Sequence, residues 1–274
     1  EKWNKINNDP RHPMQNRFKG IFAPGSSLKP IIAAIGLSQN KFSASDDFGN
    51  SGKRWQKNKS WGGYYVTTLH DYSGHNVRNA LIYSDNIYFA KAALKIGKDT
   101  LKDQFDNILS EKNLDFTFGL TASSYGSEGF TSEIQLADSG YGQGEMMVNP
   151  VHMATIYTAF SNKGNMLKPY LIKQKGSKKQ VLKEHVFSND AVKTVNDAMK
   201  QVISNPNGTG HAAQIDGIDL KGKTGTAEIK QSQTDTKGTE LGWFVTIMPK
   251  TEYKESLELV SMTEDVKKRG GSGY

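Results

Sequence analysis

The stretch Pro24-Gly25-Ser26-Ser27-Leu28-Lys29-Pro30 leads directly into an apolar segment of the 274-residue chain. Leucine, isoleucine and alanine recur at helical spacing over residues 28–35, so the sequence predicts a helix that is buried almost all round. Pro30 has no backbone N–H, which a helix tolerates only near its start. We therefore expect the helix to begin close to Ser26, and the carbonyl of Ser26 to lack its usual intrahelical partner.

Ser26 and Lys29 form a candidate nucleophile and base. Residues three apart share one face of a helix, so a neutral Lys29 could accept the proton of Ser26. An ordinary lysine has a pKa of about 10.4 and is a poor base at neutral pH unless burial or a nearby cation lowers that pKa. The start of a helix also favours developing negative charge, and the backbone N–H of Ser26 could form one arm of an oxyanion hole.

The same spacing occurs at Ser38-Gln39-Asn40-Lys41, so it does not identify the nucleophile by itself. A serine three residues before a lysine is expected about once by chance in a chain of this length. Ser38 lies at the polar end of the predicted helix, where serine and asparagine more naturally terminate it. We expect Ser26 to be the nucleophile, with Ser38 as the alternative.

Two distant motifs make the assignment more specific. Ser84-Asp85-Asn86 and Lys223-Thr224-Gly225 follow in order, and each is expected by chance in fewer than about one such chain in ten. Together with a serine three residues before a lysine, they match the signature described for penicillin-binding proteins and serine β-lactamases. That signature requires its Lys-Thr-Gly on a strand, and residues 221–230 predict one.

Each residue of the Ser84 motif has a role that its chemistry suits. Ser84 can relay a proton between Lys29 and a leaving amine, and the amide of Asn86 can hold the backbone of a substrate. Taken alone, the motif is more often a simple break between two helices.

The second motif suits the recognition of a carboxylate. Lys223 and Thr224 can bind a terminal carboxylate, and Lys223 can also be the cation that lowers the pKa of Lys29. Gly225 allows the strand to approach closely, and the backbone N–H of Thr226 can form the second arm of the oxyanion hole. Taken alone, this motif could be the end of an edge strand.

The periodicity of the chain predicts its fold class. Further helices are expected at 76–83, 87–96, 100–109, 149–164 and 188–203. Strands are expected at 221–230, 241–248 and 257–262, adjacent and antiparallel, with Gly238 in the first connection. Residues 1–22 predict an extended loop, and the aromatic residues of 46–68 predict a structured loop at a cleft rim. The order predicts one α/β or α+β domain, with an antiparallel sheet flanked by helices and a large all-helical lobe.

Composition narrows the classes of function. A formal net charge of +7 comes from scattered lysines and arginines, which favours a solvated surface over a nucleic-acid interface. The chain has no cysteine, so disulfides and thiolate metal sites are excluded. No apolar stretch approaches the roughly 20 residues of a membrane-spanning helix, and the N-terminus lacks the pattern of a signal peptide.

The chain resembles the transpeptidase domain of class B penicillin-binding proteins over nearly its whole length, and within that class it is most similar to the low-affinity, methicillin-resistance type. The finer resemblance rests on Trp55-Gln56-Lys57-Asn58-Lys59-Ser60-Trp61-Gly62-Gly63-Tyr64, Ser84-Asp85-Asn86-Ile87-Tyr88-Phe89-Ala90, Leu136-Ala137-Asp138-Ser139-Gly140-Tyr141-Gly142-Gln143-Gly144-Glu145, Gly222-Lys223-Thr224-Gly225-Thr226-Ala227-Glu228 and Gly242-Trp243-Phe244.

This resemblance implies the penicillin-binding protein and serine β-lactamase-like fold and a peptidoglycan DD-transpeptidase. Ser26 would attack a D-Ala-D-Ala stem peptide, release D-alanine and pass the acyl group to an amine on a neighbouring strand. β-Lactam antibiotics would acylate the same serine, and Tyr64 would be a gate over the cleft, or else a packed loop aromatic. The family uses no metal or organic cofactor and acts at the extracytoplasmic face of the bacterial cell membrane, beside the machinery of cell-wall synthesis.

The resemblance also implies that residues 1–274 are a partial transpeptidase domain. Family members begin with a membrane anchor and a non-catalytic pedestal, and their sheet begins with strands upstream of the motif serine; none of these is in the sequence. A terminal helix that packs on the sheet would normally follow as well. We therefore expect an exposed sheet edge.

Three other functions remain open at this point. A serine β-lactamase would share the motifs, but Glu133-Ile134-Gln135-Leu136 is followed by Ala137 rather than the asparagine expected of a class A deacylating loop. A β-lactam sensor domain would acylate once and signal through a membrane partner. An inactive wall-binding module is disfavoured by three intact motifs.

Overall fold

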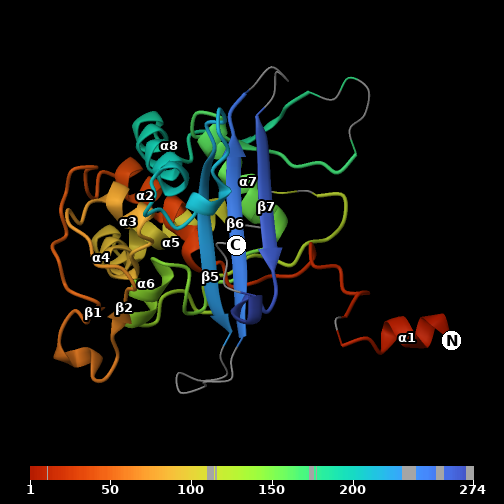
Figure 1. Ribbon diagram of the computed structural model, residues 1–274, viewed down its shortest axis with the longest axis horizontal. Helices are drawn as coiled ribbons and strands as arrows, with labels where there is room; N and C mark the ends of the chain where they lie inside the picture. Colours follow the sequence, from red (N-terminus) through yellow and green to blue (C-terminus); the bar gives the residue numbers. More distant parts are fainter. Residues whose placement is uncertain are drawn as a thin grey trace.

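The computed structural model describes residues 1–10, 12–109, 114, 116–172, 176, 178–229, 239–250 and 256–269. Within these residues a three-stranded antiparallel sheet stands beside a lobe of helices (Figure 1). The predicted fold class is therefore confirmed.

The sheet has the order β5-β6-β7. Its strands are β5 (Lys221–Ile229), β6 (Thr239–Met248) and β7 (Leu257–Thr263). Both pairs are antiparallel, as predicted, and Lys223 lies opposite Val245. Alternate residues of β6, including Trp243 and Val245, are fully buried and form the core face of the sheet. The predicted position of Gly238 lies outside the described residues.

The helix that follows Ser26 lies at the centre of the helical lobe. It is α2 (Lys29–Ser38), and its residues 31–35 are wholly buried, as their apolar character predicts. The helices of the lobe are α3 (Val77–Ile82), α4 (Asn86–Ile96), α5 (Lys98–Ile108), α6 (Glu133–Ser139) and α8 (Asn189–Ser204). α8 packs against α2 and against β5, so it joins the lobe to the sheet.

On the core side of the sheet, α7 (Pro150–Ser161) packs against β7 and lies behind it in Figure 1. The side chain of Asn149 caps its start by accepting from two backbone N–H groups, as the Asn-Pro pair predicts. The ring of His152 contacts the carbonyl of Ile108 at 2.7 Å, and Asn196 donates to the carbonyl of Phe160 at 2.8 Å. Both ends of α7 are therefore held by side-chain hydrogen bonds.

Two parts of the chain differ from the sequence prediction. Residues 1–22 include a short helix, α1 (Lys2–Asn7), which has no buried residue and extends away from the rest of the chain (Figure 1). The sequence also gave no reason to expect α6, which has only seven residues and so barely establishes a helical period. Its start is capped by Ser132, whose hydroxyl accepts from the N–H of Gln135 at 3.1 Å.

The remaining short elements are paired locally. β1 (Arg54–Trp55) pairs with β2 (Val66–Thr67), and β3 (Met166–Leu167) pairs with β4 (Val181–Lys183), both antiparallel. Single 3-10 turns are η2 (Lys59–Trp61), η4 (His211–Ala213) and η5 (Val266–Arg269).

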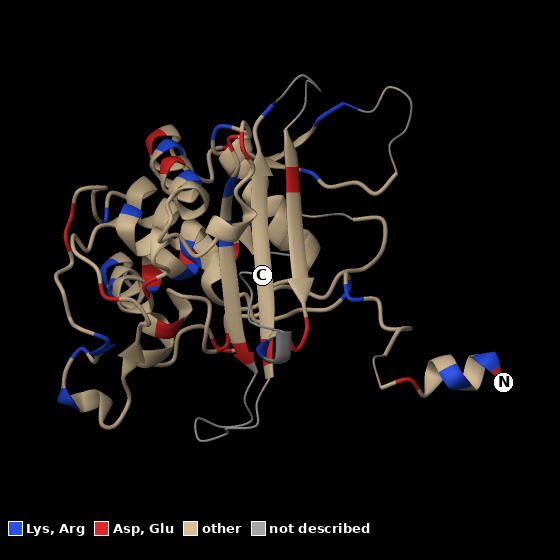
Figure 2. Ribbon diagram, viewed as in Figure 1, with Lys and Arg blue, Asp and Glu red and all other residues tan. Residues whose placement is uncertain are grey.

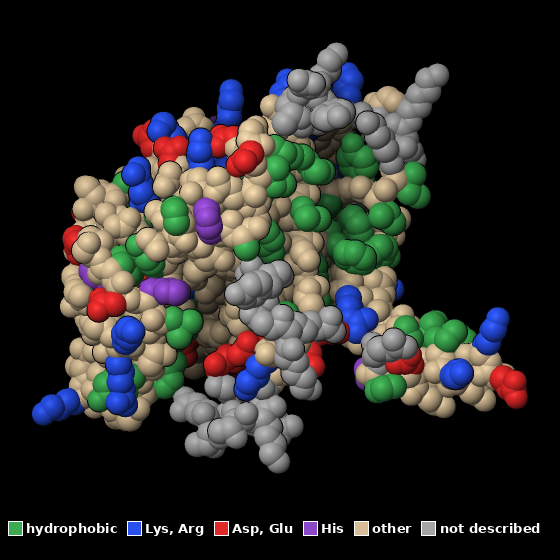
Figure 3. All heavy atoms as spheres, in the orientation of Figure 1, with side chains coloured by type: hydrophobic (Ala, Val, Ile, Leu, Met, Phe, Trp, Pro, Cys, Tyr) green, Lys and Arg blue, Asp and Glu red, His purple; other side chains and the backbone are tan. Residues whose placement is uncertain are grey.

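The surface carries charges of both signs. Figure 2 shows acidic and basic residues interspersed along the ribbon of the helical lobe. Hydrophobic side chains gather at the β7 side of the sheet in Figure 3, and Leu257 and Leu259 of β7 are 59% and 58% exposed. Among the described helices, none combines the length and the apolar character that crossing a membrane would require.

One carboxyl group is buried without a partner on the core side of β7. Both side-chain oxygens of Glu258 are inaccessible and have no hydrogen-bond partner within the described part of the chain. Burial raises the pKa of Glu258 from 4.5 to about 8. The folded chain therefore holds a proton that the unfolded chain releases between these two values, so the stability decreases as pH rises across that window.

We expect Glu258→Gln to remove this dependence, since glutamine keeps the shape of the side chain but cannot ionise. The parent should lose up to about 1.4 kcal/mol of stability per pH unit between about pH 5 and 8 through this group. Denaturant unfolding across that range measures the slope, with the exposed Glu128→Gln as the matched control. Equal slopes for Glu258→Gln and the parent would contradict the assignment.

Candidate active site

Ser26 lies in a tight turn between the sheet and α2. The turn is η1 (Gly25–Leu28), a single 3-10 turn that continues into α2, and we refer to residues 24–28 as the nucleophilic turn. Ser26 is partly exposed, whereas Ser27 and Lys29 are fully buried. The carbonyl of Ser26 lacks its usual α-helical partner, as predicted, since residue 30 is proline. The 3-10 geometry lets it accept from the N–H of Lys29 instead.

Glycines bring the backbone of β5 directly against this turn. A Cβ atom on Gly25 would lie 2.3 Å from the carbonyl oxygen of Thr226, and one on Gly225 would lie 2.7 Å from the nitrogen of Ser27. Gly25 also has a positive φ of 53° and donates its N–H to the carbonyl of Gly142 at 3.0 Å. No side chain fits between these segments, which places the backbone of Thr226 beside the nucleophilic turn.

The ammonium of Lys29 is buried among three oxygen atoms. Its Nζ donates to the carbonyl of Ser84 at 2.7 Å, to the hydroxyl of Ser84 at 3.2 Å and to Oδ1 of Asn86 at 2.7 Å. Burial, and then the nearby Lys223, lower the pKa of Lys29 well below its usual range, while the carboxylate of Asp85 opposes this. The environment thus favours the neutral amine that a base requires.

Ser84 lies between the two lysines. Its hydroxyl accepts from Nζ of Lys223 at 2.9 Å as well as contacting Lys29, so one hydroxyl bridges two buried amines. Ser84 has a φ of 54°, a left-handed conformation that an L-residue adopts at a cost. The next residue, Asp85, holds this corner by accepting from the N–H of Ile87 at 2.8 Å as the cap of α4.

Asn86 connects Lys29 to strand β2. Its Oδ1 accepts from Lys29, and its Nδ2 donates to the carbonyl of Thr67 on β2 at 3.0 Å. The structure therefore gives both ends of this amide a protein partner, and only the second N–H of Nδ2 remains for a substrate.

The Lys-Thr-Gly motif lies on β5, as the sequence predicts. Besides Ser84, the Nζ of Lys223 contacts the carbonyl of Thr224 at 2.9 Å, and burial lowers the pKa of Lys223 from 10.5 to about 7. The hydroxyl of Thr224 donates to the hydroxyl of Thr209 at 2.7 Å, so this side chain points toward the turn after α8. Both residues are held in place by contacts within the chain.

The loop between β1 and β2, which the sequence predicts to border a cleft, is fixed to α6 by its aromatic side chains. We call residues 54–67 the rim loop. The hydroxyl of Tyr64 donates to Oδ1 of Asp138 at 2.5 Å, and Tyr141 donates to the same oxygen at 2.5 Å. At the other end of α6, Glu133 accepts from Nε1 of Trp61 at 2.9 Å and pairs with Lys57. The rim loop is thus tied to α6 at two carboxylates, which the sequence did not reveal.

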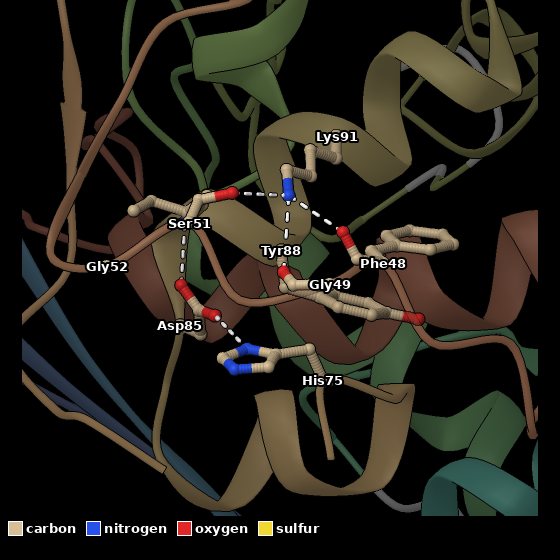
Figure 4. A pocket seen from close by; sticks show the side chains of 9 residues that line it. Phe48, Gly49, Ser51, Gly52, His75, Asp85, Tyr88 and Lys91 are labelled. Carbon is tan, nitrogen blue, oxygen red and sulfur yellow. Dashed lines mark hydrogen bonds and ion pairs between the residues drawn. The ribbon is translucent and has the colours of Figure 1, made fainter. Parts of the chain in front are cut away.

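A small cavity lies on the other side of Asp85 (Figure 4). Lys91 crosses it to donate to the carbonyl of Phe48 at 2.8 Å and to the hydroxyl of Ser51 at 2.7 Å, while His75 lies 3.8 Å from Asp85. At about 10 Å³ this cavity has room for about one water molecule, so it supports the corner at Asp85 rather than admitting a substrate.

The competing serine, Ser38, belongs to a different environment. Its hydroxyl accepts from the backbone N–H of Ser188 at 2.9 Å, at the start of α8. The structure thus brings Lys29, Ser84, Asn86 and Lys223 together around the turn that carries Ser26, and places Ser38 at a junction between two helices.

The sequence of this chain is similar to that of known proteins over its whole length. A family model of the penicillin-binding protein transpeptidase domain matches residues 1–273. Penicillin-binding protein 3 of Bacillus subtilis is 39% identical over 276 residues, which is all of this chain and 41% of that protein. The peptidoglycan D,D-transpeptidase FtsI of Escherichia coli strain K12 is 27% identical, over 82% of this chain and 37% of that protein. The chain thus spans about two fifths of the length of these relatives.

Solved structures agree on the fold. The TP domain of penicillin-binding protein 3 from Burkholderia pseudomallei superimposes with a TM-score of 0.79 at 22% identity, covering 95% of this chain and 76% of that one. The D,D-transpeptidase domain of a peptidoglycan glycosyltransferase from Eggerthella lenta gives 0.76 at 23% identity, covering 96% of this chain and 66% of that one. On the match to the family model and the shared fold, this chain belongs to the transpeptidase domain family of the penicillin-binding proteins.

Proposed function

We propose that this chain is the acyl-transfer domain of a peptidoglycan DD-transpeptidase, with Ser26 as its nucleophile. The observation that carries the proposal is the hydroxyl of Ser84 between the buried amines of Lys29 and Lys223, beneath the turn that presents Ser26. Two amines of lowered pKa linked by a hydroxyl can take up and return a proton near neutral pH.

In the first half of the reaction, neutral Lys29 accepts the proton of Ser26 while Oγ attacks the carbonyl carbon between two D-alanines. The backbone N–H groups of Ser26 and Thr226 are suited to bind the oxyanion, because the glycines bring these two segments together. The C–N bond then breaks, and the leaving amine takes the proton from Lys29 through Ser84. D-Alanine departs and an ester on Ser26 remains.

In the second half, an amine of a neighbouring stem peptide attacks the ester carbon and forms a new amide bond. The C–O bond to Ser26 breaks, and the proton of the amine passes along the same path to Oγ, which regenerates Ser26. Lys223 and Thr224 lie on the strand where the terminal carboxylate of the donor peptide would bind, and Gly225 gives that strand its close approach. Asn86 would hold the peptide through its free N–H. A β-lactam would be attacked in the same way, which makes it a covalent inhibitor.

Several finer assignments belong to this proposal. The chain would be one domain of a longer protein that acts at the extracytoplasmic face of the cell membrane, within the machinery of cell-wall synthesis. Likeness to the low-affinity, methicillin-resistance type is supported by the sequence of the rim loop. Tyr64 would act there as a gate, since its hydrogen bond to Asp138 must break if the ring is to swing away from α6.

Benzylpenicillin is expected to add once to the parent chain and not at all to Ser26→Ala, because Ser26 is the proposed nucleophile and its turn continues directly into the proposed base, Lys29. Intact-mass spectrometry after incubation measures the adduct. Ser38→Ala is the matched control and should be acylated like the parent. An adduct that persists in Ser26→Ala would overturn the assignment and point to Ser38.

The acylation rate constant should rise with pH through an apparent pKa well below that of an ordinary lysine. Lys29 acts as a base only when neutral, and its lowered pKa makes the neutral form available near neutral pH. Stopped-flow acylation by a chromogenic cephalosporin between pH 5 and 10 tests this. A profile that is flat until about pH 10 would exclude Lys29 as the base.

A serine β-lactamase is the second candidate, and the position of Glu133 argues against it. This carboxylate is occupied by Lys57 and Trp61 on the rim loop, so it is not free to activate a water for deacylation. With a chromogenic cephalosporin in excess, we expect about one acylation per chain and then slow release. Many rapid turnovers per Ser26 would favour the β-lactamase. A single stable adduct would fit both a transpeptidase and a β-lactam sensor domain.

A further inference from the structure

The carbonyl of Ser27, directly after the nucleophile, receives a hydrogen bond from a distant helix. In a 3-10 turn this oxygen would accept from the N–H of residue 30, but that residue is Pro30 and has none. The hydroxyl of Tyr157, on α7, donates to it at 2.6 Å. A side chain that is 130 residues away thus donates where Pro30 cannot.

Tyr157 is held firmly enough to fix the position of that carbonyl. Its side chain is fully buried, and its ring packs edge-on against Phe160 with the ring centroids 5.3 Å apart. The helix that carries it, α7, is secured at both ends by side-chain hydrogen bonds. Burial, with a smaller effect from the charge of Glu258, raises the pKa of Tyr157 well above its usual value, so the hydroxyl remains a donor at any working pH.

The opposite end of the nucleophilic turn is held in a similar way. Nε1 of Trp243, a fully buried residue of β6, donates to the carbonyl of Ala23 at 2.9 Å. Between these two contacts, the hydroxyl of Ser27 donates to the carbonyl of Pro24 at 2.7 Å. The backbone on both sides of Ser26 is therefore set by polar atoms of aromatic side chains that belong to the hydrophobic core.

We propose that Tyr157 is a positioning residue for acyl transfer, which holds the carbonyl of Ser27 and thereby directs Ser26 toward the base and the reacting carbonyl. This inference rests on the proposed role of Ser26 as nucleophile. Tyr157 has no exposed surface, so it does not touch a substrate and acts only through the backbone of the turn. Its loss should slow the chemical step without weakening the binding that precedes it.

The test is Tyr157→Phe, which removes one oxygen atom and keeps the ring. Tyr88→Phe is the matched control, because Tyr88 is also buried and its hydroxyl has no hydrogen-bond partner among the residues that the structure describes. Stopped-flow acylation by a chromogenic cephalosporin over a range of concentrations separates the dissociation constant of the first complex from the first-order acylation constant. Thermal unfolding of each variant accompanies these measurements.

In Tyr157→Phe we expect the first-order acylation constant to fall about tenfold, with the dissociation constant within about twofold of the parent. Tyr88→Phe should match the parent in both. An acylation constant within about twofold of the parent for Tyr157→Phe, or a loss that appears only in the dissociation constant, would overturn the inference. Failure of the parent itself to be acylated would instead refute the proposed function.

If Tyr157→Phe does not fold, the same kinetic measurements are made on a chain with 3-fluorotyrosine at position 157. The fluorine strengthens the hydroxyl as a donor at nearly unchanged shape, so the first-order constant should differ from the parent by about twofold or more, again at constant affinity. Equality with the parent would then contradict a positioning role.

Discussion

The sharing of one hydroxyl by two buried amines is the interaction on which the rest of this site depends. Lys29 and Lys223 both lie in the interior, where two ammonium groups at close range disfavour each other's charge. Both amines donate to the hydroxyl of Ser84 in the structure, and the single proton of that hydroxyl can turn toward whichever amine is neutral. With one lysine charged and the other neutral, the charged amine donates to Ser84 and the neutral amine accepts from it, so both contacts are hydrogen bonds.

The fold meets this requirement by bringing three separate pieces of chain to one point. The corner at Ser84 is formed where α3 ends and α4 begins, and Asp85 stabilises it by capping α4. α2 supplies Lys29 from the middle of the lobe, and β5 supplies Lys223 from the sheet. α8 packs against both α2 and β5, so the distance between the two lysines is set by the packing of helices and sheet rather than by a flexible loop.

The sequence predicted the parts of this structure that have a local signal. Apolar spacing and capping residues such as Asn149 and Ser188 located the longer helices, and the three motifs located the lysines and Ser84. The contacts of Tyr157 and Trp243 could not be predicted, because a buried tyrosine or tryptophan has the same pattern whether or not its polar atom has a distant partner. The Ser26 carbonyl lacks its α-helical donor, as predicted, but nothing in the sequence showed that a 3-10 turn supplies another donor one residue earlier.

The close approach of Gly25, Gly142 and Gly225 has a consequence for how such a domain can change over evolutionary time. A Cβ atom at any of these positions would meet backbone at 2.7 Å or less, so almost no substitution is tolerated there. The surrounding rim loop is different, since it is joined to α6 by side chains such as Tyr64 and Lys57 that can be exchanged one at a time. Sequence change in this domain is therefore far easier to accommodate in the rim loop than at the three glycines.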